Sequence, residues 1–176
     1  MTRVLPPNYR VDHPFPRSWL LVSGVLAGRS EEVLEQQRDS SAGSAGVDDR
    51  PALTIDQLLI QSRLGLERVL PEDLNREMSA GALVVDTRPA DQRERDGDLP
   101  GAIVIDRNVL EWRLDPSSPS RLPIADNHSR RIVIVCNEGY SSSLAAHTLQ
   151  RLGLTRATDL VGGFQAWRAL QNQIKD

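Results

Sequence analysis

The chain has a single cysteine, few aromatic residues and no long apolar run. Cys136 is the only cysteine among 176 residues, and aromatic residues make up 4% of the chain. A lone cysteine cannot form an intramolecular disulfide, which is typical of a reducing compartment and leaves a free thiol to explain. The longest early apolar run, Trp19 to Ala27, contains Ser23 and Gly24 and is too short to span a bilayer. We therefore expect a cytoplasmic protein without a membrane partner.

The chain also lacks a strong charge excess of either sign. Its formal net charge of -3 gives no whole-chain attraction to nucleic acid, so no nucleic-acid partner is expected. The three histidines, His13, His128 and His147, match no ligand spacing, and no second cysteine joins them. We therefore expect no metal site. The sequence leaves the oligomeric state open.

Little regular structure is expected near the amino terminus, where a small hairpin at Trp19 to Arg29 and a short helix from Ser30 to about Arg38 are the candidate elements. Residues 1–18 are rich in proline, and residues 39–51 have the Gly, Ser and Asp composition of a flexible linker. Four prolines and Asp12 make the first stretch a poor signal peptide. The linker cannot bury enough apolar area to offset its chain entropy. We expect an N-terminal extension of low order over residues 1–50 and one domain over residues 51–176.

Strand and helix patterns alternate through the rest of the chain. A leading helix is expected at 54–62, with Thr54 as its cap and Ile55, Leu58 and Leu59 on one face. Strands are expected at residues 67–70, 82–85, 102–105, 131–136 and 158–161. Between and after them, helices are expected at 71–79, 89–95 and 108–114, along an apolar stripe from Leu144 to Leu152, and around Phe164 and Trp167. This alternation predicts an α/β fold, with a mainly parallel sheet of roughly five strands and helices on both faces.

Cys136 stands at the end of the uninterrupted β-branched run that marks the central strand. Ligands bind at this edge of a parallel sheet, where loops lead into helix N-termini. The next residues turn the chain into a helix; they are Asn137, Glu138, Gly139, Tyr140, Ser141 and Ser142. A glycine and several serines allow such a loop to direct backbone N–H groups at one point, which lowers the pKa of a thiol there. This pattern favours a nucleophile over the alternative, an inert buried cysteine.

Three segments together resemble the rhodanese homology domain, over about residues 66–172. They are VVDTRPADQRERDGDLPGA (84–102), IVIVCNEGYSSSLAAHTLQRLG (132–153) and ATDLVGGFQAW (157–167). These are similar, in order, to the family's Asp-x-Arg strand end with its downstream Glu, its Gly-x-x-Pro-Gly-Ala turn, its cysteine-bearing loop and its Gly-Gly-Phe-x-x-Trp closing segment. The resemblance implies a three-layer α/β/α sulfurtransferase of the single-domain type.

The resemblance also implies a chemistry. Cys136 would take sulfane sulfur from a donor, thiosulfate or a persulfide, as a covalent persulfide and pass it to a nucleophilic acceptor. The backbone N–H groups of residues 137–142 would hold the anionic terminal sulfur. The expected partners are a small sulfur-containing anion or a thiol or persulfide, with a protein as a further candidate acceptor. No metal or organic cofactor is expected.

The cysteine loop departs from the family pattern at one position. Many active members carry an arginine five positions after the cysteine, where this chain has Ser141, and Glu138 adds a negative charge. Loss of that charged hydrogen bond would weaken an anionic donor roughly tenfold to a hundredfold. The same absence counts against phosphatase or arsenate-reductase chemistry, because a dianion needs a cationic fork. The alternative function is a catalytically inactive rhodanese-like module for binding or regulation.

Three further residues are expected to support the site. The resemblance suggests that Arg88 and Glu94 pair near the active-site edge, and the preferred interpretation is a structural ion pair that fixes the loop. Asp86, at the end of its strand, is expected to accept hydrogen bonds from backbone N–H groups.

Overall fold

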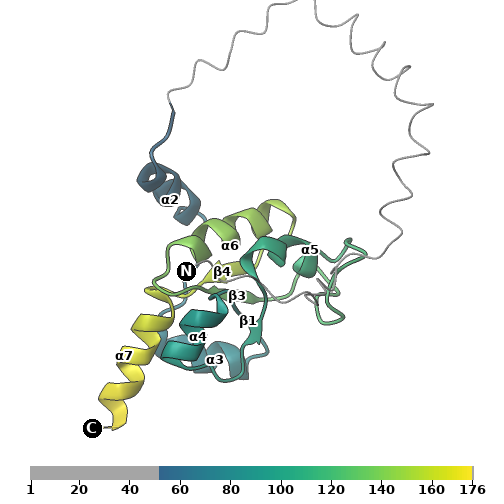
Figure 1. Cartoon of the computed structure of the whole chain (residues 1–176). Coiled ribbons are helices and arrows are strands. Elements are labelled where there is room, and N and C mark those ends of the chain that lie inside the picture. Colours follow the sequence, from purple (N-terminus) through teal and green to yellow (C-terminus); the bar gives the residue numbers. More distant parts are fainter. Residues whose placement is uncertain (1–51, 176) are drawn as a thin grey trace, which may run out of the picture. The chain divides into compact units, whose positions relative to one another are not determined.

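The structure is a computed structural model that describes residues 52–175 (Figure 1). This part of the chain contains one parallel sheet. The sheet has four strands in the order β2-β1-β3-β4. They are β1 (Leu83–Asp86), β2 (Ile103–Val104), β3 (Ile132–Val135) and β4 (Ala157–Asp159). The extension that we expect over residues 1–50 lies outside the described residues.

Helices precede, connect and follow the strands. The α-helices are α2 (Ile55–Arg63), α3 (Leu74–Ser79), α4 (Ala90–Asp96), α5 (Leu110–Leu114), α6 (Ser141–Arg151) and α7 (Gly163–Lys175). Two 3-10 turns, η3 (Pro71–Asp73) and η4 (Arg107–Val109), lead into α3 and α5. Within residues 52–175, no helix has the length and apolar character needed to cross a membrane.

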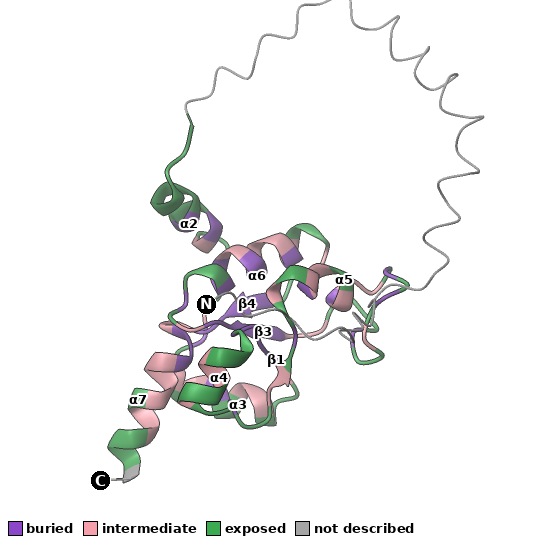
Figure 2. Cartoon of the chain, viewed as in Figure 1, coloured by how far each residue is buried: buried purple, intermediate pink, exposed green. Residues whose placement is uncertain are grey.

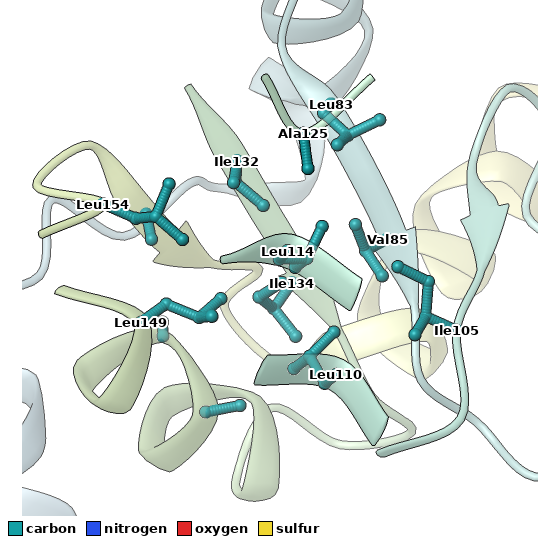
Figure 3. Close-up of a cluster of buried hydrophobic side chains, with 13 residues drawn as sticks. Leu83, Val85, Ile105, Leu110, Leu114, Ala125, Ile132, Ile134, Leu149 and Leu154 are labelled. Carbon is teal, nitrogen blue, oxygen red and sulfur yellow. The ribbon is translucent and has the colours of Figure 1, made fainter. Parts of the chain in front are cut away.

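The sheet is covered on both faces because its central strands are apolar on both sides. Alternate residues of β3 point to opposite faces, so Ile132 and Ile134 join one apolar cluster while Val133 and Val135 join the other. The first cluster includes residues of α5 and α6 (Figure 3), and the second includes residues of α3 and α7. Figure 2 shows β3 buried along its length. The expected three-layer α/β/α architecture is therefore confirmed.

The expected fifth strand, at residues 67–70, is reduced to a single bridge between Val69 and Leu160. Val69 N–H donates to the Asp159 carbonyl at 3.0 Å, and Val161 N–H donates to the Val69 carbonyl at 2.8 Å. Pro71 has no N–H group and begins η3, so the pairing cannot continue. The sheet of the described residues therefore has four strands rather than five, and the segment at 67–70 lies beside β4.

Helix α2 begins as expected, but its exposed side is more apolar than expected. Thr54 caps the helix in a reciprocal capping box with Gln57. Of the three residues expected on one apolar face, only Leu59 is buried, whereas Ile55 is 64% exposed and Leu58 is 42% exposed. Helix α2 packs on α6, which directs its larger apolar side chains at the sheet. The contact of α2 with α6 is therefore narrow, and only Leu59 and Ser62 of α2 are buried.

Helix α6 offers a test of the core, because two leucines near its C-terminus differ in burial. Leu149 is 0% exposed in the cluster of Figure 3, and Leu152, which the apolar stripe also assigned to the core, is 40% exposed. We expect Leu149→Ala to lower the free energy of unfolding by about 2–5 kcal/mol, because it leaves a cavity. The matched change Leu152→Ala should cost less than about 1 kcal/mol. Urea unfolding measures both, and equal losses would contradict this description of the core.

Candidate active site

Cys136 directly follows β3, at the carboxyl edge of the sheet. Its side chain is 7% exposed and lines a pocket of about 350 Å³. The pocket lies between the segment after β1, residues 87–92, and the cysteine loop, residues 136–142, which leads into α6. Cys136 is thus mostly buried but borders a space large enough for a small substrate.

The cysteine loop surrounds the sulfur with hydrogen-bonding groups. The N–H of Gly139 donates to Cys136 Sγ at 3.2 Å, and the thiol donates to Ser142 Oγ, also at 3.2 Å. Gly139 has a φ of +77°, as the sequence predicts for the glycine of this loop. When the thiol loses its proton, the Ser142 hydroxyl can rotate and donate to the sulfur in turn.

Burial and hydrogen bonds from the loop act in opposite directions on the pKa of the thiol. Burial raises the pKa of Cys136, but hydrogen bonds from the Ser141 and Ser142 hydroxyls and from the N–H groups of Ser142 and Glu138 lower it by more. The net effect holds the pKa of Cys136 below that of an ordinary cysteine. The thiolate, which is the nucleophilic form, is therefore stabilised by the loop.

A buried carboxylate at the end of β4 holds the serines beneath the loop. Asp159 Oδ2 accepts hydrogen bonds from the hydroxyls of Ser142 at 3.1 Å and Ser143 at 2.7 Å. Arg68 completes the group, with its Nε 2.8 Å from Asp159 Oδ1. Asp159 was not among the residues expected at the site, although an acid at the carboxyl end of a strand next to the cysteine's strand is a usable signal.

The carbonyl oxygen of Gly139 accepts hydrogen bonds from two arginines that were not expected at the site. Arg63, the last residue of α2, donates to this oxygen at 2.8 Å, and Arg68 donates to it at 3.3 Å. Arg63 also donates to Ser143 Oγ at 3.1 Å and lies 5.8 Å from the centre of the Tyr140 ring. No local pattern pointed to these arginines, because they precede the loop by about seventy residues or more.

Two glycines after β4 allow α7 to begin directly against the cysteine loop. A Cβ atom on Gly163 would lie 2.5 Å from the Cys136 carbonyl oxygen, and one on Gly139 would lie 2.8 Å from the Gly162 nitrogen. The first N–H groups of α7 then cap the loop: Phe164 donates to the Cys136 carbonyl at 2.9 Å. The Gly-Gly pair therefore does more than form the tight turn that its sequence suggests.

The expected ion pair between Arg88 and Glu94 is wrong. Arg88 instead forms a buried pair with Asp86, with its terminal nitrogen 2.7 Å from Oδ2, and its guanidinium stacks 3.4 Å from the centre of the Phe164 ring. Asp86 also accepts the N–H of Arg88 at 3.0 Å, which confirms its expected backbone role. Asp86 is nearer because it ends the same strand from which Arg88 emerges, whereas Glu94 is exposed on α4.

The remaining predicted residues line or support the pocket. Asn137 Oδ1 accepts a hydrogen bond from Gln165 at 3.0 Å, which ties the loop to α7. Glu138, Tyr140 and Ser141 are exposed, and all three line the pocket. Residues 52–175 hold no group of three or more His, Cys, Asp and Glu side chains that could bind a metal ion.

Comparison with known proteins agrees with this geometry. A family model, the Rhodanese-like domain, matches residues 70–170. The thiosulfate sulfurtransferase GlpE of Stutzerimonas stutzeri is 30% identical over 103 residues, which cover 58% of this chain and 84% of that protein. The adenylyltransferase and sulfurtransferase uba4 of Emericella nidulans is 28% identical over 120 residues, which cover 58% of this chain but only 25% of the fungal protein.

A solved structure is also similar to the chain. It is a protein of unknown function from Rhodopseudomonas palustris, described as a possible tyrosine phosphatase, with 32% identity and a TM-score of 0.62. The match covers 72% of this chain and 97% of that one. The family model itself spans more than half of the sequence and includes the cysteine, its loop and the four strands. The chain therefore belongs to the family of rhodanese-like domains.

Proposed function

We propose that the protein is a sulfurtransferase that carries sulfane sulfur as a persulfide on Cys136. The observation that supports this most directly is the environment of Cys136: its Sγ accepts the Gly139 N–H and donates to the Ser142 hydroxyl, and the residue lines a pocket. Sulfurtransferase activity is also named for two relatives, GlpE and uba4. An inactive binding module, the alternative, would have no use for a cysteine whose pKa is lowered in this way.

The proposed reaction has two steps. In the first, the Cys136 thiolate attacks the outer sulfur of the donor, a new S–S bond forms at Cys136, and the donor's own S–S bond breaks. The bonding electrons leave with the donor remnant, which is sulfite from thiosulfate or a thiolate from a persulfide. In the second step, an acceptor nucleophile attacks the outer sulfur and releases Cys136 as a thiolate. The scheme is ping-pong and needs no net oxidation.

The loop supplies electrostatic stabilisation in both steps. The outer sulfur of the persulfide carries negative charge, and backbone N–H groups of the loop stabilise it as an oxyanion hole stabilises oxygen. The N-terminal end of α6 adds the positive end of a helix dipole at the same place. A less charged donor suits this site, because Glu138 lines the pocket and no arginine stands in the loop.

Phosphatase activity, which the description of the Rhodopseudomonas palustris protein gives as possible, fits the loop less well. A phosphate group brings a dianion that a bidentate arginine commonly binds. This chain has no arginine or lysine between Cys136 and Arg151, and its loop carries the acidic Glu138 instead. Transfer of an uncharged or singly charged sulfur group makes a smaller demand on the site. The loop therefore favours sulfur transfer.

The first prediction concerns the covalent intermediate. Incubation with glutathione persulfide should add the mass of one sulfur atom to the wild-type chain, and a thiol reductant should remove it. Cys136→Ser should gain nothing, because the chain has no other cysteine. Intact-mass spectrometry distinguishes the two. A wild-type protein that stays unmodified by both glutathione persulfide and thiosulfate would favour the inactive module.

The second prediction concerns pH. Because the pKa of Cys136 is lowered, its alkylation by iodoacetamide should stay fast at pH values where a free cysteine has become slow. The rate should fall only as the pH drops through the lowered pKa. Ser142→Ala removes a donor to the thiolate, so its pH profile should move upward and its rate at neutral pH should fall roughly tenfold. Ser117→Ala, an exposed serine outside the site, is the control and should follow wild type.

The third prediction concerns the missing arginine. Ser141→Arg places a cation at the mouth of the pocket and should raise kcat/KM for thiosulfate roughly tenfold, because a charged hydrogen bond to an anion is restored. Ser141→Met adds a side chain without charge and serves as the control. A correctly folded Ser141→Arg variant with unchanged or lower turnover would contradict this account of the loop.

A further inference from the structure

Arg63 and Arg68, which precede the residues matched by the family model, contact the cysteine loop at the carbonyl oxygen of Gly139. The matched segment begins at residue 70, whereas Arg63 ends α2 and Arg68 lies just before the bridge at Val69. Both donate to the carbonyl oxygen of Gly139, at 2.8 Å and 3.3 Å respectively. Residues outside the matched segment thus contact the backbone of the active-site loop.

The hydrogen bonds from Arg63 and Arg68 to the Gly139 carbonyl oxygen fix the orientation of the Gly139–Tyr140 peptide group. The C=O and N–H of one planar trans peptide point in opposite directions. With the Gly139 oxygen held toward the arginines, the N–H of Tyr140 is turned to the opposite side. Successive N–H groups beside a glycine of positive φ form a concave site for an anion, and the Gly139 N–H already donates to Cys136 Sγ at 3.2 Å.

Arg63 makes three separate contacts with the loop. Besides the Gly139 carbonyl, it donates to Ser143 Oγ at 3.1 Å, and its guanidinium lies 5.8 Å from the centre of the Tyr140 ring. A cation over an aromatic face is attracted to it. Arg63 therefore contacts the Gly139 carbonyl, the Ser143 hydroxyl and the Tyr140 ring, three groups on or next to the peptide that joins Gly139 to Tyr140.

The charges beneath the loop do not cancel. Asp159 is fully buried and accepts both Nε and a terminal nitrogen of Arg68, at 2.8 Å and 3.0 Å. Arg63 has no carboxylate partner of its own among residues 52–175, so the three groups sum to one positive charge. Glu138 lies on the exposed side of the loop, and the buried pair of Arg88 with Asp86 is neutral. A net cation therefore lies behind the loop that lacks an arginine of its own.

We propose that Arg63 and Arg68 are positioning residues for the sulfur anion: they hold the Gly139–Tyr140 peptide with its N–H toward the sulfur and supply the positive charge that Ser141 does not. This inference rests on the proposed function for the identity of the anion, a persulfide, but its geometry concerns the thiolate equally. Helix α2 is thereby part of the active site, although it lies outside the matched segment.

Arg63 is the better residue to test, because it has no buried carboxylate to leave unpaired. In the full chain, Arg63→Met removes the donors and the charge, and Arg63→Gln keeps one donor for the Gly139 carbonyl without the charge. Arg121→Met, which changes an exposed loop arginine, is the matched control. Three measurements are made on each variant: the pH profile of iodoacetamide alkylation, persulfide formation from glutathione persulfide by intact mass, and urea unfolding.

We expect Arg63→Met to move the alkylation profile to higher pH and to slow alkylation at neutral pH roughly tenfold, with Arg63→Gln between it and wild type. Arg121→Met should match wild type. Persulfide formation should slow in the same order. Unfolding alone would not move the pH profile of the folded fraction, so this readout separates positioning from general stability.

The proposal is overturned if folded Arg63→Met and Arg63→Gln both keep the wild-type pH profile of alkylation. If Arg63→Met does not fold, an unchanged profile in Arg63→Gln is enough to overturn it. Failure of the proposed function looks different. The wild-type chain would then take up no sulfur, while the Arg63 variants would still shift the alkylation profile.

Discussion

The hydrogen bond from the Gly139 N–H to Cys136 Sγ, at 3.2 Å, is the contact on which the site depends, and the surroundings of Gly139 are built to hold it. On one side the glycine packs against the backbone of Gly162 and Gly163, with no space for a Cβ atom. On the other side Arg63 takes its carbonyl oxygen. The glycine is thus held at both its α-carbon and its carbonyl, next to the N–H that donates to the sulfur.

The parallel sheet explains why these groups meet. The carboxyl ends of β1, β3 and β4 lie at one edge, and they deliver Asp86, Cys136 and Asp159 to it. Both aspartates are buried and each is paired with an arginine, Arg88 or Arg68. Buried ion pairs add little stability once desolvation is counted, but breaking one leaves an unpaired buried charge, which is destabilising. Their effect here is to hold the two loops that flank the pocket.

The sequence predicted the layers of the fold, the central strand and the cysteine loop, because these depend on local patterns. A β-branched run followed by a loop with Gly139 and three serines needs no distant information. The contacts that hold the loop from beneath could not be predicted in the same way. Asp159, Arg63 and Arg68 reach it across 16 to 80 residues of sequence, and only the completed sheet and the docking of α2 bring them near.

The errors have the same origin. Arg88 was paired with Glu94 because of a family pattern, whereas the strand end places Asp86 within reach first. The fifth strand was assigned from residues 67–70, whose composition suits a strand, but the proline that follows ends the pairing after one bridge. In both cases a neighbouring residue, Asp86 or Pro71, decided the outcome.

Because Gly139 contacts the backbone of Gly162 and Gly163, positions in the cysteine loop differ in how well they tolerate substitution. A methyl group at Gly139 or Gly163 would collide with main-chain atoms, so the path of the chain is intolerant of mutation. The exposed side chain of Glu138 meets no such restriction, whereas Ser141 donates a hydrogen bond to the sulfur and Tyr140 lies against Arg63. Directed evolution of substrate preference could therefore begin at position 138 while the backbone that carries the sulfur keeps its shape.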